Sequence, residues 1–140
     1  MNGEAVTLGF VCVQNAGRSQ MATAFAERER SRRGLGDRVH ILMGGTHPAE
    51  EVHPEVVEAM AEIDIDISDR VPQNVSPTEL NNATVVATMG CSTLKLDADV
   101  TVHDWALDDP HGESPEEVRR IRDEIEQRVS RLFDEYTSKR

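Results

Sequence analysis

The chain has 140 residues, a formal net charge of −11 at pH 7 and two cysteines, and its length fits one domain spanning residues 1–140 with a buried core. The negative charge argues against nucleic acid as a partner, and the absence of a run of about 18 apolar residues argues against a membrane partner. Two cysteines without zinc-site spacing, and an N-terminus unlike a signal peptide, predict a cytoplasmic protein.

The first predicted elements enclose a short loop that begins with a cysteine. Thr7–Val13 predicts a buried parallel strand. A helix is predicted from Arg18 to about Arg33, and Gly34-Leu35-Gly36 ends it. Five residues therefore separate Cys12 from Arg18, in a loop between a strand and a helix.

This Cys-x5-Arg-Ser loop is typical of an anion site with a cysteine nucleophile. Such a loop points its backbone N–H groups into one concavity, and the helix N-terminus adds a positive dipole end. Arg18 can donate two N–H groups to one anion, and the same field favours the thiolate of Cys12. Asn15 and Gly17 suit a left-handed backbone, and Ser19 can donate its hydroxyl to the thiolate. The residues expected to hold the oxyanion are Val13, Gln14, Asn15, Ala16, Gly17, Arg18 and Ser19.

Strands and helices alternate along the rest of the chain. Pro54 opens a helix with apolar residues at helical spacing. Asp64-Ile65-Asp66-Ile67 alternates as a strand would, but its shortness favours the exit of that helix. Ser76-Pro77-Thr78-Glu79 has the pattern of a capping box and predicts a short helix. The remaining predicted elements are strands at Val39–Met43, Thr84–Met89 and Val100–His103 and a long helix capped at Ser114-Pro115.

The Cys12 loop resembles that of the low-molecular-weight protein tyrosine phosphatase superfamily, and Cys12 through Met21 is most similar to its thioredoxin-coupled arsenate reductases. The resemblance covers nearly the whole chain. It includes Gly44-Gly45-Thr46-His47, Val52-His53-Pro54, Ile63–Ser68, Trp105 through Pro110 and Arg122-Asp123-Glu124-Ile125.

Alternating strands and helices predict an α/β fold with a parallel sheet and helices on both faces. We expect four strands in the order 2-1-3-4, a flavodoxin-like arrangement of the phosphatase I type. This order places the Cys12 loop at the carboxyl edge of the sheet, at the switch point where such sheets bind ligands.

The segment Asp108-Asp109-Pro110-His111-Gly112 follows the last predicted strand, at the same edge of the sheet. The resemblance assigns proton donation to the departing oxygen to Asp109, directly before Pro110, with Asp108 as the alternative. His111 is a candidate to border the site. His47, His53, His103 and His111 lack metal-ligand spacing, and most of them are expected in loops or helix caps, so no metal or cofactor is predicted. Trp105 is expected in the core.

Cys91 separates two activities. In the reductases a cysteine near this place attacks the Cys12–arsenic adduct, releases arsenite and leaves a disulfide. Gly90 would let Cys91 approach within the Cα separation of about 4.4–6.8 Å that a disulfide requires. A buried structural cysteine is the alternative. Thioredoxin-coupled members carry a third cysteine, which this chain lacks, so the thiol reductant is thioredoxin, a glutaredoxin-like protein or a small thiol.

The resemblance implies an arsenate reductase in which Cys12, Arg18, Asp109 and Cys91 act on arsenate or a phosphate-type oxyanion. The alternative is a phosphatase that hydrolyses phosphate monoesters through a phosphocysteine. Its tyrosine-specific members have aromatic residues after the Asp-Pro pair, whereas this chain has His111-Gly112, which favours a small inorganic substrate. A third possibility is a protein that binds oxyanions without turnover.

The charged residues have an unusual composition. Of 15 basic residues only Lys95 and Lys139 are lysines, against 26 acidic residues. Acid-rich, lysine-poor surfaces suit a high-salt cytoplasm, where salt screens the repulsion between carboxylates. An ordinary acidic bacterial protein is the alternative.

Overall fold

The structure is a computed structural model that describes residues 5–89 and 100–137. Its elements are β1 (Val6–Cys12), α1 (Arg18–Arg32), β2 (Val39–Gly45), α2 (Pro54–Ala61), α3 (Pro77–Leu80), β3 (Val85–Met89), β4 (Thr101–Asp104) and α4 (Pro115–Thr137). Every predicted strand and helix is present, with bounds shifted by no more than a few residues. The segment after α2 is a turn and not a strand: Ile65 N–H bonds back to the Met60 carbonyl, and Asp64 has a φ of +66°.

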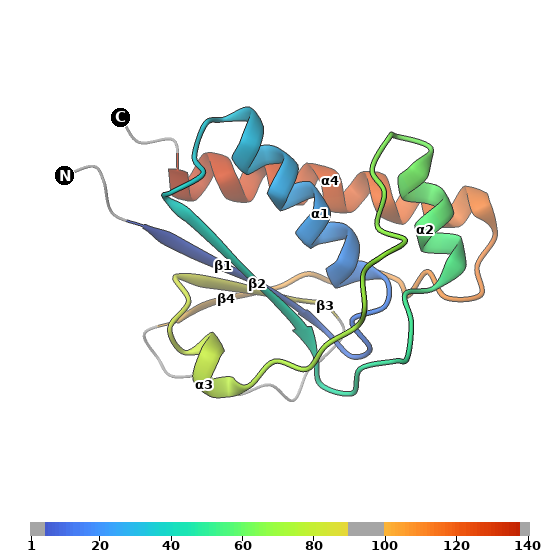
Figure 1. The fold of residues 1–140 in the computed structure, drawn as a ribbon, viewed down its shortest axis with the longest axis horizontal. Coiled ribbons are helices and arrows are strands. Elements are labelled where there is room, and N and C mark those ends of the chain that lie inside the picture. The colour runs from blue at the N-terminus through green and yellow to red at the C-terminus, as the bar shows by residue number, and fades with distance from the viewer. Residues whose placement is uncertain (1–4, 90–99, 138–140) are drawn as a thin grey trace.

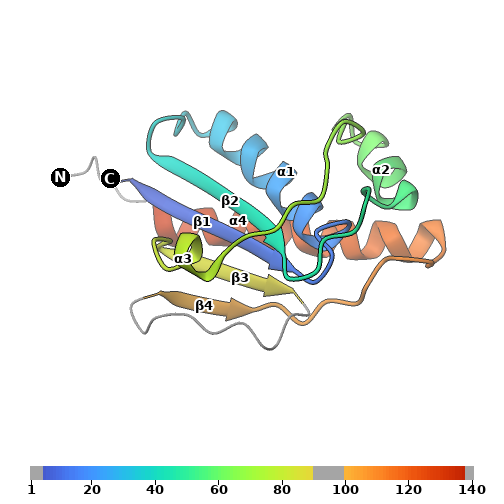
Figure 2. The same cartoon turned by 60° about the horizontal axis from the view of Figure 1, so that its bottom comes forward.

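The four strands form one parallel sheet in the order β2-β1-β3-β4 (Figures 1 and 2). The predicted fold class and strand order are thereby confirmed. In the register of the sheet, Cys12 at the end of β1 pairs with Gly45 of β2 and Met89 of β3. Cys12 therefore lies at the carboxyl end of a central strand, where open α/β sheets bind ligands.

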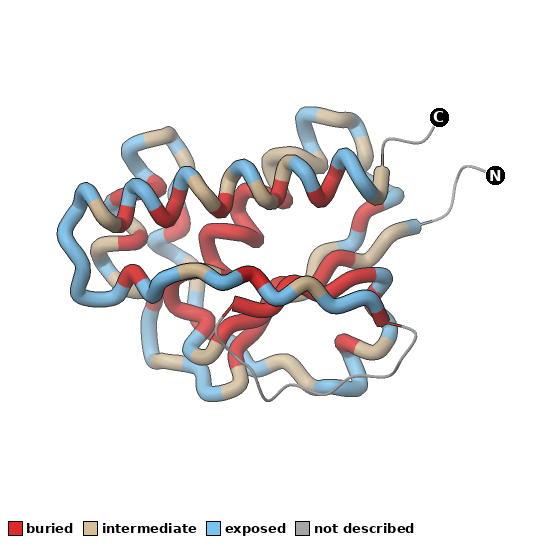
Figure 3. Tube along the Cα trace, turned by 180° about the vertical axis from the view of Figure 1, so that it is seen from behind, coloured by how far each residue is buried: buried red, intermediate tan, exposed pale blue. Residues whose placement is uncertain are grey.

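Helices lie on both faces of the sheet, as predicted, but cover them unequally. α1, α2 and α4 lie on one face and the short α3 on the other (Figure 1). The larger core, under the three longer helices, contains Phe10, Phe25, Phe133 and, as expected, Trp105. The core on the second face comprises Val11, Leu80, Ala83, Val86 and Val100. Figure 3 shows buried positions concentrated along the strands and recurring along α4.

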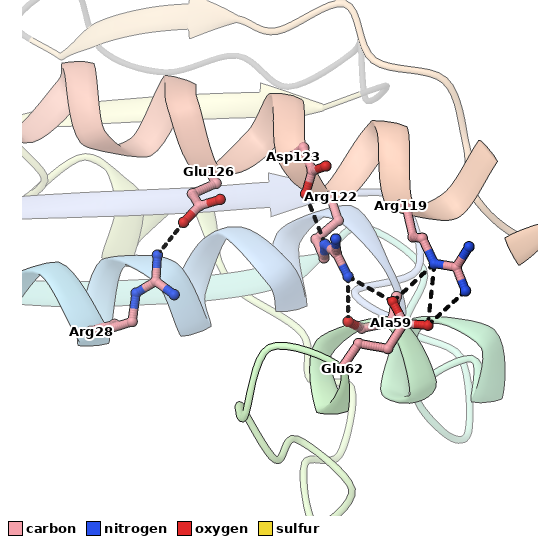
Figure 4. Close-up of polar contacts among 7 residues, drawn as sticks. All are labelled: Arg28, Ala59, Glu62, Arg119, Arg122, Asp123 and Glu126. Atoms are coloured by element: carbon pink, nitrogen blue, oxygen red, sulfur yellow. Dashed lines mark hydrogen bonds and ion pairs between the residues drawn. The ribbon is translucent and has the colours of Figure 1, made fainter. Parts of the chain in front are cut away.

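Arginine contacts fix α2 against α4 (Figure 4). The Arg122 side chain is 9% exposed, and its Nη1 donates to the Ala59 carbonyl oxygen at 2.7 Å and to Glu62 at 3.0 Å. The other pairs drawn there are Arg119–Glu62, Arg122–Asp123 and Arg28–Glu126. The contacts of Arg122 and Arg119 with Ala59 and Glu62 hold the C-terminal end of α2 against α4, whereas Arg28–Glu126 joins α1 to α4. The N-terminal end of α2 borders the candidate site. None of the described helices is long and apolar enough to cross a bilayer.

Candidate active site

The loop after Cys12 turns its carbonyl groups away from the site. All five carbonyl oxygens from Cys12 to Ala16 accept a hydrogen bond from elsewhere in the chain, at 2.7–3.2 Å. The donors are the backbone N–H groups of Thr46, His47, Ala49 and His53 and the side chain of Gln20. Since N–H and C=O of a trans peptide point in opposite directions, the N–H groups of Val13–Gly17 face the other way. Successive N–H groups on one side of a loop form an anion-binding nest.

Close packing holds the loop in this conformation. A Cβ on Gly45 would lie 2.5 Å from the Val13 carbonyl oxygen and 2.9 Å from the Asn15 nitrogen, so a larger residue would displace the loop. The Gly44-Gly45-Thr46-His47 segment therefore packs directly against the Cys12 loop and supports its conformation. In the sequence this segment was noted only because it resembles the family.

The Cys12 side chain lies at the base of the loop and receives two polar contacts. The residue is 2% exposed. Its Sγ lies 2.9 Å from the Ser19 hydroxyl and accepts a hydrogen bond from the Asn15 N–H at 3.2 Å. These two contacts hold the sulfur at the base of the loop, on the side of the cavity.

Asn15 fixes the direction of the Ser19 proton. Its Oδ1 accepts from the Gln73 N–H at 2.9 Å and from Gln20 Nε2 at 3.1 Å, which leaves its Nδ2 to donate to the Ser19 hydroxyl at 2.7 Å. Because the Ser19 oxygen already accepts this bond, its own proton can be donated to Cys12. Asn15 has a φ of +51°, a left-handed conformation that asparagine tolerates better than most residues. Asn15 therefore adopts the left-handed backbone that the sequence predicted, and the Ser19 hydroxyl lies where it can donate to Cys12.

Arg18 begins α1 and closes one side of the site. Its side chain is 11% exposed, its Nη1 donates to the Leu107 carbonyl at 3.0 Å, and its Nη2 lies 4.0 Å from an Asp109 oxygen. No side chain caps the N-terminus of this helix at Gly17, and no acidic residue lies in its first turn. The first helical hydrogen bond runs from the Met21 N–H to the Gly17 carbonyl, so earlier N–H groups precede the helical ladder.

The two candidate acids lie in different surroundings. Asp109 lines the cavity next to Cys12, and its Oδ1 accepts from the His111 N–H at 3.0 Å. Asp108 instead pairs with Arg120 of α4 at 3.0 Å. The structure thus brings Asp109, and not Asp108, to the same cavity as Cys12 and Arg18.

A cavity of about 310 Å³ opens over the loop. Its lining residues are Cys12, Val13, Gln14, Ala16, Gly17, Arg18, His53, Asp109 and His111. His53 and His111 stack with ring centroids 3.9 Å apart, and His53 Nε2 donates to Gln14 Oε1 at 3.2 Å. Burial, together with the neighbouring His111, lowers the pKa of His53 below its ordinary value, which favours the neutral imidazole. His111 borders the cavity, as the sequence suggested.

Several residues that line the cavity or hold its loops were not predicted from the sequence, and one predicted site residue lies outside the described residues. His53 was expected in a loop or cap; it is the N-cap of α2 and also lines the cavity. Glu55 accepts a hydrogen bond from Gly112, and the Leu107 carbonyl accepts one from Arg18. Both contacts join residues far apart in the sequence, so no local sequence pattern predicts them. Cys91 lies in 90–99, outside the described residues. Within residues 5–89 and 100–137 no group of three or more His, Cys, Asp or Glu could hold a metal ion.

Comparison with known proteins identifies the family. Residues 7–140 match the low molecular weight phosphotyrosine protein phosphatase family. The chain belongs to this family. A protein of Halobacterium salinarum, provisionally named an arsenate reductase, is 64% identical over 138 residues, 97% of each chain.

Two solved structures of arsenate reductases are similar in fold to this chain. The thioredoxin-dependent arsenate reductase Cg_ArsC1' of Corynebacterium glutamicum has a TM-score of 0.78 and 30% identity over 96% of this chain, but only 63% of its own length is covered. An arsenate reductase in a phosphate-binding state has a TM-score of 0.78 at 26% identity, over 94% of this chain and 99% of its own.

Proposed function

We propose that this protein is an arsenate reductase that uses Cys12 as its nucleophile. One observation carries the proposal: the thiol of Cys12 receives the Ser19 and Asn15 contacts at the base of a loop whose five carbonyls are turned away. The names of the Halobacterium and Corynebacterium relatives support arsenate as the substrate.

In the first step the Cys12 thiolate attacks arsenic(V). The N–H groups of the Val13–Ser19 loop and the Arg18 guanidinium hold the arsenate oxygens and stabilise their charge in the transition state. One As–O bond breaks, and Asp109 donates a proton so that the oxygen departs as water. The product is a Cys12–arsenic(V) adduct, with no change yet in oxidation state.

In the second step the Cys91 thiolate attacks Cys12 Sγ. A sulfur–sulfur bond forms, the Cys12–arsenic bond breaks, and its electron pair leaves with arsenic as arsenite. The two cysteines thereby supply the two electrons that reduce arsenic(V) to arsenic(III). Cys91 follows Met89 by two residues, and Met89 pairs with Cys12 in the sheet, which supports this assignment. A thiol reductant (thioredoxin, a glutaredoxin-like protein or a small thiol) then restores the cysteines.

The alternative function is hydrolysis of phosphate monoesters. The family is named for this activity, and the first step would use Cys12, Arg18 and Asp109 in the same way, with water then hydrolysing a phosphocysteine. Among the described residues that line the cavity, however, the only rings are the stacked imidazoles of His53 and His111, and none is an apolar ring that would suit a phenyl group.

A mass-balance experiment tests the proposal. The purified protein is mixed with arsenate without reductant, and then with excess dithiol. We expect one arsenite per protein and a Cys12–Cys91 disulfide in the first case, and continued turnover in the second. Cys12→Ser should still bind arsenate but release no arsenite. Cys91→Ser should form no disulfide and release no arsenite without an added thiol.

Three outcomes contradict the proposal in different ways. Turnover by Cys12→Ser would remove the mechanism. A parent protein that hydrolyses aryl phosphates but reduces arsenate with no donor would be a phosphatase. A parental rate for Cys91→Ser with a small thiol would show that the external thiol, and not Cys91, attacks the adduct.

A further inference from the structure

The loop that carries Asp109 is attached to α2 through one carboxylate. Glu55, in the first turn of α2, accepts a hydrogen bond from the Gly112 N–H at 2.6 Å and lies 3.3 Å from His111 Nδ1. The His111 ring stacks on His53, the N-cap residue of the same helix. Two residues of the 108–112 loop therefore contact the N-terminal end of α2.

These neighbours determine where Asp109 lies. The His111 N–H donates to Asp109 Oδ1, and buried Pro110 packs against Gly17, where a Cβ would come within 3.1 Å of Pro110 Cγ. The Asp109 side chain is itself 57% exposed, and its ion pair with Arg18 is long, with Nη2 and Oδ2 4.0 Å apart. Its own contact with the site is therefore weak, and its position depends on the rest of the loop.

Glu55 is suited to a lasting contact. Burial favours its neutral form, but hydrogen bonds from Gly112 and from its own N–H, together with the two histidines, outweigh that effect and lower the pKa of Glu55. The carboxylate consequently stays ionised and a strong acceptor at neutral pH. Its helix is fixed to α4 by Arg122, so the acceptor has a defined position.

We propose that Glu55 and His111 form a latch that holds the 108–112 loop against α2, which makes Glu55 a positioning residue for proton donation by Asp109. The inference rests on the proposed function, because it takes Asp109 as the acid. Without the latch, Asp109 no longer stays at the cavity edge. Proton transfer to the departing oxygen then slows, while the Cys12 loop, whose carbonyl contacts do not involve Glu55, keeps its geometry.

The test combines kinetics with amide exchange. Arsenate reduction with excess dithiol is measured for the parent, Glu55→Ala, Asp109→Asn and the double variant. Glu58→Ala is the matched control, because Glu58 is an exposed carboxylate one turn further along α2. Glu55→Ala should lower kcat about tenfold, and the double variant should equal Asp109→Asn within about twofold, since the latch acts through Asp109. Hydrogen exchange at the Gly112 amide should be about tenfold faster in Glu55→Ala than in Glu58→Ala.

The outcomes separate the latch from the proposed function. Equal kcat values for the Glu55 and Glu58 variants, or a double variant about tenfold slower than Asp109→Asn, would overturn the positioning role. Equal Gly112 exchange in the two alanine variants would overturn the latch itself. If the parent reduces no arsenate, the proposed function fails, and the exchange measurement still decides the latch. Should Glu55→Ala not fold, His111→Phe takes its place, because it keeps the ring stack and removes the Nδ1 contact with Glu55. We expect this variant to lower kcat and to speed Gly112 exchange, each by less than Glu55→Ala would.

Discussion

Replacing Asn15 with alanine is expected to lower the free energy of unfolding by about 4 kcal/mol. Asn15 is fully buried, and its side chain makes three hydrogen bonds, to Ser19, Gln20 and the Gln73 N–H. Each contributes about 1 kcal/mol net. The φ of +51° adds about 1 kcal/mol when alanine replaces a residue that tolerates a left-handed backbone.

Two further variants separate these contributions. Asn15→Gly loses the same hydrogen bonds but accepts the left-handed backbone, so it should be less destabilising than Asn15→Ala by about 1 kcal/mol. Asn82→Ala is the control, because exposed Asn82 makes one side-chain hydrogen bond, to the Thr78 carbonyl, and should lose less than about 1 kcal/mol.

Urea unfolding at neutral pH gives the free energies of the parent and the three variants. Because the chain has a second cysteine, alkylation of Cys12 by iodoacetamide is followed on the Cys12 peptide by mass spectrometry. Asn15→Ala should slow alkylation, because the Ser19 proton is no longer directed at the sulfur. An unfolding free energy within about 1 kcal/mol of that of Asn82→Ala would refute the assigned network. Alkylation at the parental rate would refute the role of Asn15 in orienting Ser19.

Two other predictions concern the acid and the surface charge. Asp109→Asn should slow arsenate reduction by about 100-fold or more, whereas Asp108→Asn, which breaks only the exposed pair with Arg120, should change it less than about twofold. Similar losses in both would point to a structural role for the loop. With a net charge of −11, the melting temperature should rise from dilute buffer to molar KCl as salt screens carboxylate repulsion. An unchanged melting temperature contradicts the interpretation of the surface as adapted to high salt.

Local sequence patterns predicted the helices and strands, because nearby residues determine where each helix or strand begins and ends. The Ser76–Glu79 capping box is formed as expected, with the Ser76 hydroxyl accepting from the Glu79 N–H at 3.1 Å. The two central strands, β1 and β3, were recognisable as short apolar runs because both of their faces are buried, whereas the edge strand β4 is mostly exposed. The Cys12 loop was predictable for a similar reason, because Cys12, Arg18 and the helix N-terminus lie close together in the sequence.

The rest of the site depends on contacts between distant segments. His53 looked like an ordinary helix cap, which it is, and only the tertiary fold stacks it on His111, 58 positions later. Glu55 has the appearance of a favourable acidic residue in a first helical turn. Its partner Gly112 lies 57 positions away, so no local pattern announces the contact.

The segment from Thr46 to Glu55 connects the Cys12 loop with the 108–112 loop. Its backbone N–H groups bind the carbonyls of the Cys12 loop, and its last residues, His53 and Glu55, contact His111 and Gly112. A displacement of this segment would therefore disturb the anion nest and the position of Asp109 together. Arg122 joins α2 to α4, so the packing of α4 also affects the positions of the Cys12 loop and the 108–112 loop. In the proposed mechanism, the geometry of the first step therefore depends on a segment that contains none of the residues proposed to react.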